Sequence, residues 1–144
     1  MMTNDTDMLN SIRKTTEMGA YGIRAVMEET GNPELYKELK AQLTEYEKIY
    51  EEADALLQDR GGKAENVSPM AKMSSSMSAK MKIRMSKNPN AKVAELMMQG
   101  NTKGMIKSIH NSRTMGVLDP KVSGLSNRLL QTEQANIDTL KTFL

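Results

Sequence analysis

The sequence lacks cysteine and tryptophan altogether, and it has one phenylalanine and one histidine among 144 residues. Without cysteine the chain can form no disulfide, no thiolate metal site and no thiol nucleophile. Aromatic residues make up only 3% of the chain, so its core must be built mainly from aliphatic side chains. Methionine, leucine and alanine favour helices over strands, and the composition therefore favours a helical protein.

Segments that direct or anchor a protein are also missing from the sequence. The N-terminal stretch MMTNDTDMLNSIRK has neither the basic region nor the apolar region of a signal peptide. No apolar run approaches the roughly 18 residues that a transmembrane helix needs. The net charge of +2 is too small to indicate nucleic-acid binding. We therefore expect a cytoplasmic protein with no nucleic-acid partner.

Four prolines divide the chain, and each follows a residue that commonly caps the N-terminus of a helix. Asparagine, serine and aspartate accept hydrogen bonds from the first free backbone N–H groups, and proline is favoured at the first helical position. The four pairs are Asn32-Pro33, Ser68-Pro69, Asn88-Pro89 and Asp119-Pro120. With a further start near the N-terminus, they predict helices over about 5–30, 33–60, 69–87, 89–115 and 120–143.

Glycines predict where several of these helices end, because glycine commonly occupies the position after a helix. They are Gly31, the pair Gly61 and Gly62, and Gly116. No stretch alternates apolar with polar residues as a strand does. Each of the four longer helices has an apolar face. We therefore predict a single all-α domain over 1–144, a four-helix bundle of two helical hairpins joined by a crossover containing an extra amphipathic helix.

A weak internal repeat supports this organisation. A shift of 87 residues lays the segment NPELYKELKAQLTEYEKIYEEADALL over DPKVSGLSNRLLQTEQANIDTLKTFL. Leu35 then coincides with Val122, and Tyr50 with Ile137. Two similar hairpins joined by a long crossover are the organisation of a ferritin-like four-helix bundle. Any two amphipathic helices aligned on a proline cap would give the same correspondence, and this alternative stays open.

In its helices the chain resembles a bacterial ferritin-like four-helix-bundle family of unknown function. The resemblance rests on LNSIRKTTEMGAYGIRAVMEE with Gly19 and Gly22, on the NPELYKELKAQLTEYEKIYEEADALL segment, and on AELMMQGNTKGMIKSIHNSRTMGVLDP with Gly100, where the family often has a helical glycine. The segment 70–85 fits the family's crossover helix poorly. The resemblance implies a ferritin-like fold over most of residues 8–143.

The resemblance also implies a metal site that this sequence does not reproduce. Ferritin-like enzymes bind two metal ions with a glutamate on each of two helices and a Glu-x-x-His motif on each of the other two. Here the one histidine, His110, lies off the apolar face of its helix, and Glu133 is followed three residues later by Asn136. The repeat places Tyr46 and Ile49 at the matching positions. We therefore expect no catalytic residues, no bound metal, no cofactor and no enzymatic activity.

Glu133 nevertheless faces the core of the predicted bundle, and a buried carboxylate without a partner is costly. We favour a satisfied polar layer, in which Glu133 is hydrogen-bonded to Tyr46 or Gln42 with Asn101 and Asn136 nearby. Such a layer can set the register of packed helices. The alternative is a degenerate ferritin-like site in the bundle core that binds a single metal ion or a small ligand.

Five of the 14 methionines lie in the stretch MAKMSSSMSAKMKIRM, at a spacing that places them on one face of a helix. We favour helix packing, on the chain's own bundle or on a second subunit, because methionine adapts to irregular surfaces. Copper(I) binding and a membrane-surface helix are alternatives that lack, respectively, the usual His or Cys ligands and the Trp, Phe and Leu anchors. This methionine stripe consists of Met70, Met73, Met77, Met81 and Met85.

Charge favours a protein contact for the methionine stripe. Residues 69–87 carry five basic residues and no acid, whereas residues 33–60 carry eight acidic and four basic residues, a net charge of −4. A basic helix beside an acidic one, within or between chains, makes use of both charges.

We therefore predict a non-catalytic scaffold that acts through protein–protein contacts and self-association, as a homodimer or another homo-oligomer, with a further protein partner as an option and no membrane association. This prediction requires that most of the methionine stripe be buried in the assembly. The alternative is a metal-binding or small-ligand-binding protein centred on Glu133, Tyr46 and Asn136.

Overall fold

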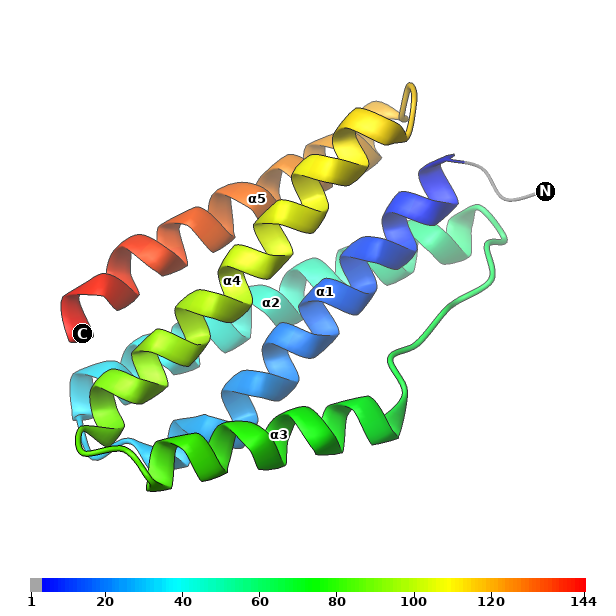
Figure 1. The fold of residues 1–144 in the computed structure, drawn as a ribbon. Coiled ribbons are helices and arrows are strands. Elements are labelled where there is room, and N and C mark those ends of the chain that lie inside the picture. The colour runs from blue at the N-terminus through cyan, green and yellow to red at the C-terminus, as the bar shows by residue number, and fades with distance from the viewer. Residues whose placement is uncertain (1–3) are drawn as a thin grey trace.

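The computed structural model describes residues 4–144; residues 1–3 of the predicted domain lie outside this range. The described chain is all-helical, as predicted (Figure 1). Its elements are α1 (Asn4–Val26), the short 3-10 helix η1 (Met27–Glu29), α2 (Pro33–Asp59), α3 (Pro69–Arg84), α4 (Pro89–Thr114), α5 (Pro120–Leu140) and the 3-10 helix η2 (Lys141–Phe143).

The four prolines mark helix starts, and this prediction is confirmed. Each of α2 to α5 begins at its proline, and the side chain before that proline accepts a hydrogen bond from a backbone N–H of the first turn. Asn32 Oδ1, for example, accepts from the N–H groups of Glu34 and Leu35. These caps satisfy donors that a helix leaves unpaired at its N-terminus.

The helix ends follow the glycines less closely than predicted. Gly61 has a φ of +63° and closes α2: its N–H donates to the Gln58 carbonyl, and the Gly62 N–H donates to the Leu57 carbonyl. Gly31 and Gly116 lie beyond α1 and α4 without the left-handed conformation that defines such a cap. At the first of these ends the chain tightens into η1 instead, so the predicted helix over 5–30 finishes as a 3-10 turn.

The four long helices form two antiparallel hairpins, α1 with α2 and α4 with α5, and the hairpins pack on each other through α1 with α4 and α2 with α5 (Figure 1). The long connection 60–88, which includes α3, runs from one end of the bundle to the other. The core between the four helices is aliphatic, as the composition predicts. Its fully buried side chains include Leu9, Ile12, Leu39, Ile49, Leu57, Leu129 and Leu140.

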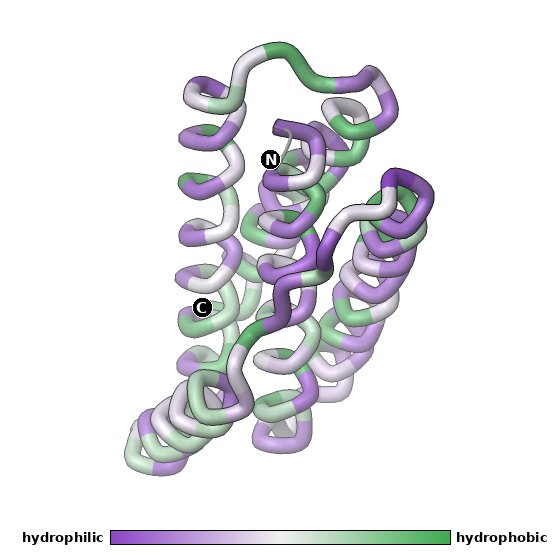
Figure 2. The backbone as a smooth tube through the Cα atoms, turned by 90° about the vertical axis from the view of Figure 1, so that its right-hand side faces the viewer, coloured by the Kyte–Doolittle hydropathy of each residue, from purple (hydrophilic) through white to green (hydrophobic). Residues whose placement is uncertain are grey.

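Hydrophilic and hydrophobic residues alternate along the helices (Figure 2), as expected where each helix buries one face. Among the helices between Asn4 and Phe143, none is long and apolar enough to cross a membrane.

α3 lies outside this arrangement, packed against α1 and α4. Ile83 is the one residue of α3 that is buried, and the five side chains of the methionine stripe are between 61% and 80% exposed. Packing of the stripe on the chain's own bundle, one of the two predicted forms, is therefore wrong. The predicted contact within one chain between basic α3 and acidic α2 is also wrong, because α3 packs on α1 and α4. α3 is instead held against the bundle by the buried Ile83 and by an ion pair near each of its ends.

Candidate functional site

Four of the five predicted polar residues meet in the middle of the bundle. The Tyr46 hydroxyl oxygen of α2 lies 2.7 Å from Asn101 Oδ1 and 3.0 Å from Glu133 Oε2. Asn136 Nδ2 donates to Asn101 Oδ1 at 3.0 Å, and Asn101 Nδ2 donates to the Met97 carbonyl at 2.8 Å. The four side chains are at most 7% exposed. This polar layer, Tyr46, Asn101, Glu133 and Asn136, joins α2, α4 and α5.

Both contacts of the Tyr46 hydroxyl are hydrogen bonds at the same time only when Glu133 carries a proton. Asn101 Oδ1 is an acceptor, because its amide nitrogen is directed to the Met97 carbonyl, so at 2.7 Å it takes the single hydroxyl proton of Tyr46. The contact between the Tyr46 oxygen and Glu133 Oε2 then needs a proton from the carboxyl group. In this neutral form Glu133 Oε2 donates to the Tyr46 oxygen, and Glu133 Oε1, which has no hydrogen-bond partner among the described residues, is the carbonyl oxygen of the acid.

The electrostatics agree with a neutral acid. Burial raises the pKa of Glu133 to about 8; a hydrogen bond donated by the Tyr46 hydroxyl to the ionised carboxylate would lower it by less. Burial, followed by the proximity of Glu133, raises the pKa of Tyr46 well above its usual range. An ionised carboxylate would be costly at this depth unless a cation or several donors faced it. Both groups therefore carry their protons at neutral pH.

Gln42, the fifth predicted residue, is buried but does not join the polar layer. Its amide nitrogen donates to Glu38 Oε1 at 3.0 Å, and its Oε1 has no hydrogen-bond partner within residues 4–144. Gln42 lies one turn before Tyr46 on α2, and its side chain is directed along the helix to a residue four positions earlier. Of the two predicted partners of Glu133, Tyr46 forms the hydrogen bond and Gln42 does not.

Two glycines make room for the polar layer. A Cβ atom at Gly104 of α4 would lie 2.2 Å from Glu133 Oε2 and 2.6 Å from Oε1, and a Cβ at Gly19 of α1 would lie 2.7 Å from the Tyr46 ring. Real Cβ atoms do not approach other heavy atoms so closely. The carboxyl group and the tyrosine ring thus rest directly on the backbone of neighbouring helices, and any larger residue would displace them.

A cavity of about 670 Å³ opens from the polar layer toward α3, between α1, α3 and α4. Glu133, Tyr46 and Asn101 form its floor, since they are the buried polar residues of its lining. Its volume lies within the roughly 300–1,000 Å³ range of small-molecule sites in proteins. The apolar part of its wall comes from Met18, Ile23, Val67, Ala79, Leu96 and Met97.

The charges around this cavity are of one sign. Four lysines line it, and Glu133, neutral at its floor, is the one acid among the lining residues. Lys82 of α3 and Lys103 and Lys107 of α4 are exposed, so their ammonium groups lie at the solvent side of the cavity. The fourth, Lys14 of α1, is paired with Glu65 at 2.8 Å. The mouth of the cavity is therefore cationic.

α3 covers the cavity and is fastened at both ends. Near its N-terminus Lys72 Nζ lies 3.5 Å from Glu17 Oε1 and 5.8 Å from the centre of the Tyr21 ring. At its C-terminus Arg84 donates to Glu29 at 2.7 Å, beside the buried Ile83. Between these ends four of the five α3 residues that line the cavity are small, and the fifth is Lys82; the four are Ser75, Ser76, Ser78 and Ala79. The space under the middle of α3 is open because these side chains are too short to fill it.

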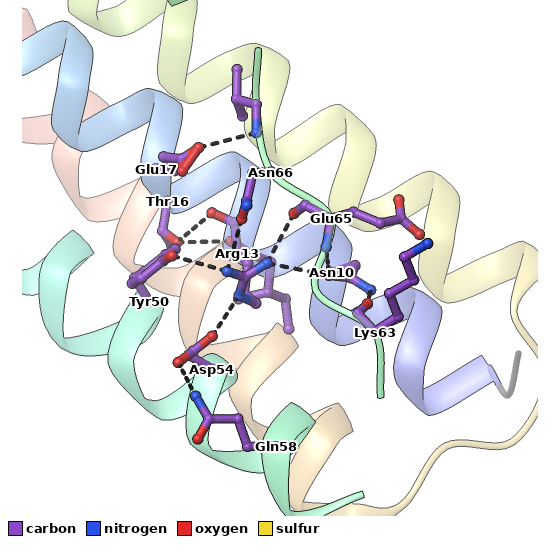
Figure 3. Close-up of polar contacts among 12 residues, drawn as sticks. Asn10, Arg13, Thr16, Glu17, Tyr50, Asp54, Gln58, Lys63, Glu65 and Asn66 are labelled. Carbon is purple, nitrogen blue, oxygen red and sulfur yellow. Dashed lines mark hydrogen bonds and ion pairs between the residues drawn. The ribbon is translucent and has the colours of Figure 1, made fainter. Parts of the chain in front are cut away.

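The chain that leads into α3 is held on α1 by a buried arginine (Figure 3). Arg13, 4% exposed, makes five hydrogen bonds. It donates to Asp54 Oδ1 at 3.0 Å and to the Tyr50 hydroxyl at 3.0 Å, and its guanidinium lies 5.1 Å from the centre of the Tyr50 ring. It also donates to the Glu65 carbonyl at 2.9 Å. One side chain thus links α1, α2 and the crossover.

Two further side chains of α1 fix the backbone of the crossover (Figure 3). Asn10 Nδ2 donates to the Lys63 carbonyl and Asn10 Oδ1 accepts from the Glu65 N–H, both at 2.9 Å. Glu17 Oε1 accepts from the Val67 N–H at 3.1 Å. These side chains supply hydrogen-bond partners for the backbone of residues 63–67, which belong to no helix. This part of the crossover therefore has a defined path along α1.

The arginine was not predicted from the sequence, although a signal for it exists. Arg13 directly follows Ile12 and lies four residues after Leu9, on the edge of the apolar face of α1. A charged residue within an apolar face requires buried partners, and Asp54 and Tyr50, at the matching edge of α2, supply them. No sequence pattern predicts the cationic mouth of the cavity, because its lysines come from different helices whose relative placement cannot be predicted from the sequence.

The residues described offer no metal-binding cluster. Between residues 4 and 144, no group of three His, Asp or Glu side chains lies close enough to hold an ion. His110 is exposed on α4, as its position off the apolar face predicted.

Comparison with known proteins gives no match for this chain, whether with protein-family models, with curated proteins or with solved structures. The resemblance to a ferritin-like family therefore stays a prediction based on the quoted motifs.

Proposed function

We propose that this protein is a non-catalytic helical scaffold of ferritin-like organisation, located in the cytoplasm, that associates with a second copy of itself through the methionine stripe of α3. The ferritin-like part rests on two antiparallel hairpins, on the long crossover between them, and on the contact between Tyr46 and Glu133, which occupy the same position of the 87-residue repeat.

The observation that carries the proposed association is the outward direction of the apolar face of α3. Its five methionines are 61–80% exposed, while Ser75, Ser76 and Ser78 line the cavity. A helix normally turns its apolar face to the protein, and a contiguous apolar patch on a surface commonly marks a contact site. Burying each methionine fully is worth roughly 1.5–3 kcal/mol, so a partner that covered the stripe would gain several such contributions.

Charge favours a contact between α3 of one copy and α2 of the other over side-by-side pairing of the two α3 helices. Five basic residues and no acid lie between 69 and 87, so two α3 helices side by side would repel each other. The acidic residues of α2 form no ion pair with α3 in the same chain, because α3 pairs with Glu17 and Glu29 instead. Four acidic residues of α2 already pair with arginines of the same chain. In a second copy, the α2 acids without an ion pair among the described residues would offer complementary charge; they are Glu34, Glu38, Glu51 and Asp59.

Sedimentation velocity over a range of protein concentrations tests this association. We expect the unaltered protein to form concentration-dependent dimers or larger species that weaken with salt. The double variant Met77→Ser/Met81→Ser should stay monomeric, with the melting temperature of the unaltered protein when both are measured below the concentration of association. Ile106→Ser/Ile109→Ser on α4, also exposed apolar positions, is the matched control and should associate normally. A monomer at every concentration, or normal association of the methionine variant, would refute the proposal.

A second candidate function is the binding of a small ligand in the cavity under α3. It is favoured by one observation: Glu133 lines this cavity, and its buried Oε1 has no partner among the described residues. Elemental analysis of protein purified without added metal tests whether the ligand is a metal ion. The scaffold and an organic ligand both predict a protein without bound metal. We expect no stoichiometric iron, manganese, zinc or copper; one tightly bound ion per chain, lost in Glu133→Ala, would contradict both the scaffold and the organic ligand argued below.

A further inference from the structure

The floor of the cavity has an unused hydrogen-bond acceptor. Glu133 is 1% exposed, its Oε2 is occupied by Tyr46, and its Oε1 has no partner among the described residues. The proton count above makes Oε1 a carbonyl oxygen, so the group that would complete it is a hydroxyl or N–H donor. A buried acceptor left unpaired costs about 1–3 kcal/mol, and a ligand that supplies a donor recovers this cost.

The mouth of the cavity has unused cations. Lys82, Lys103 and Lys107 form no ion pair within the described part of the chain, whereas Lys14 is paired with Glu65. Because Lys103 and Lys107 are four residues apart on α4, they lie on one face of that helix. A carboxylate or phosphate at the mouth would meet two ammonium groups from α4 and one from α3.

Between floor and mouth the cavity is apolar. Gly22 of α1 faces Met97 of α4, with 3.9 Å between a Cβ built at Gly22 and the Met97 methyl carbon. Ile23, Leu96 and Ala79 line the same space. These walls favour a hydrocarbon body over a polar one.

We propose that this cavity binds an amphipathic organic anion, with its acidic group at Lys82, Lys103 and Lys107, its hydrocarbon body between α1, α3 and α4, and a hydroxyl donor at Glu133 Oε1. The inference rests on the second candidate function. It does not depend on the association through the methionine stripe, since the stripe lies on the opposite side of α3 from the cavity.

Isothermal titration with 10-hydroxydecanoate at pH 7 tests the proposed site. We expect saturable binding of one molecule per chain. The variant Lys103→Gln/Lys107→Gln should bind about tenfold more weakly, because two exposed ion pairs together contribute roughly that much. Lys40→Gln/Lys48→Gln, which removes the same charge from exposed positions of α2, should bind normally. Equal weakening by both variants would show non-specific attraction and overturn the assignment of the mouth.

Filling the cavity separates it from other surfaces that bind amphiphiles. Gly22→Leu places a side chain in the apolar part of the cavity without close contact at its Cβ, and it replaces glycine by a better helix former. We expect an unchanged or higher melting temperature and loss of binding. Met77→Ser/Met81→Ser should bind the probe normally, which also distinguishes this proposal from the association through α3. Normal binding by Gly22→Leu, or no binding by the unaltered protein, would overturn it.

Decanoate, which lacks the terminal hydroxyl, tests the floor. We expect it to bind at least about fivefold more weakly than 10-hydroxydecanoate, because Glu133 Oε1 then stays unpaired. Equal affinity of the two would overturn the role given to Glu133.

Discussion

Methionine side chains are buried in the bundle and exposed on α3. Met8 in α1 is 1% exposed and Met27 in η1 is 8% exposed, whereas every methionine of the stripe is at least 61% exposed. The bundle buries its apolar faces and encloses a polar layer. α3 presents its methionines to solvent, and Ser75, Ser76 and Ser78 line the cavity beneath it. Periodic methionine alone therefore does not indicate burial; the neighbours of a helix decide which of its faces is covered.

The two regions also differ in how they are held. In the bundle, aliphatic side chains interlock over the full length of four helices. α3 is held by Ile83, by ion pairs at its ends and by the anchored crossover. We therefore expect changes inside the bundle to alter stability and changes on the outer face of α3 to alter association.

The largest effect should come from the pH dependence of Glu133. Because its folded pKa is raised above the value in the unfolded chain, the folded state binds a proton that the unfolded state has released between about pH 4.5 and 8. Stability should therefore fall as pH rises through this window, by up to about 1.4 kcal/mol per pH unit. Urea unfolding at pH 5, 6, 7 and 8, followed by circular dichroism, measures the slope.

Two variants isolate the contribution of Glu133 to this slope. Glu133→Gln keeps the shape and removes the titration, so its stability should vary less with pH and exceed that of the unaltered protein at pH 8. Glu51→Gln, at an exposed position of α2, is the matched control and should retain the full slope. The same slope in Glu133→Gln as in the unaltered protein would show that this carboxyl is ionised in the fold.

Arg13→Ala should destabilise the protein by about 3–5 kcal/mol, because it removes the buried partner of Asp54, Tyr50 and the crossover backbone. Hydrogen exchange should at the same time become faster at the Val67 N–H and along α3. Arg24→Ala, whose pair with Glu47 is exposed, should change stability by less than about 1 kcal/mol. Similar losses in the two variants would mean that the crossover is not held through Arg13.

Met8→Ala and Met77→Ala compare the two regions directly. The first leaves a cavity in the core and should cost about 2–5 kcal/mol. The second removes an exposed side chain and should change the stability of the monomer by no more than about 0.5 kcal/mol. Urea unfolding at a protein concentration below that of association measures both. A large loss in Met77→Ala under these conditions would place the stripe against the chain's own bundle.

Gly104→Ala and Gly100→Ala should change stability in opposite directions, although they lie one turn apart on α4. At Gly104 a Cβ would collide with the Glu133 carboxyl, and we expect a loss of about 1–3 kcal/mol. At Gly100 no atom lies within 4 Å of the added Cβ, and the gain in helix propensity should stabilise the protein by up to about 1 kcal/mol. Thermal unfolding of the pair measures the difference; a shift in the same direction would contradict the close packing on Gly104.

Much of the fold follows from local signals in the sequence. The Asn32, Ser68, Asn88 and Asp119 caps and the prolines after them act through hydrogen bonds within one helical turn, so helix starts can be read without knowledge of the tertiary structure. Helix ends are less predictable, because a tightened turn such as η1 needs no glycine. The polar layer could be predicted because Tyr46 and Glu133 share a position of the repeat and both lie on apolar faces.

The parts that could not be predicted depend on which helix meets which. Gln42 faces the core as expected, but its amide pairs with Glu38 on its own helix, and no sequence pattern distinguishes that from a bond across the bundle. The need for glycine at Gly104 arises only where Glu133 of another helix approaches it. The lysines of the cavity mouth come from separate helices and are brought together by packing.

By itself, the sequence determined the helical class, the starts of four helices, the aliphatic core faces and the inward direction of Glu133, since each depends on contacts within a few residues or on helical periodicity. The tertiary structure decided that α3 turns its methionines outward, that Arg13 holds the crossover, and that a cavity with a neutral acid at its floor and lysines at its mouth lies under α3. These features depend on contacts between helices far apart in the chain, and spacing along one helix carries no information about its neighbours.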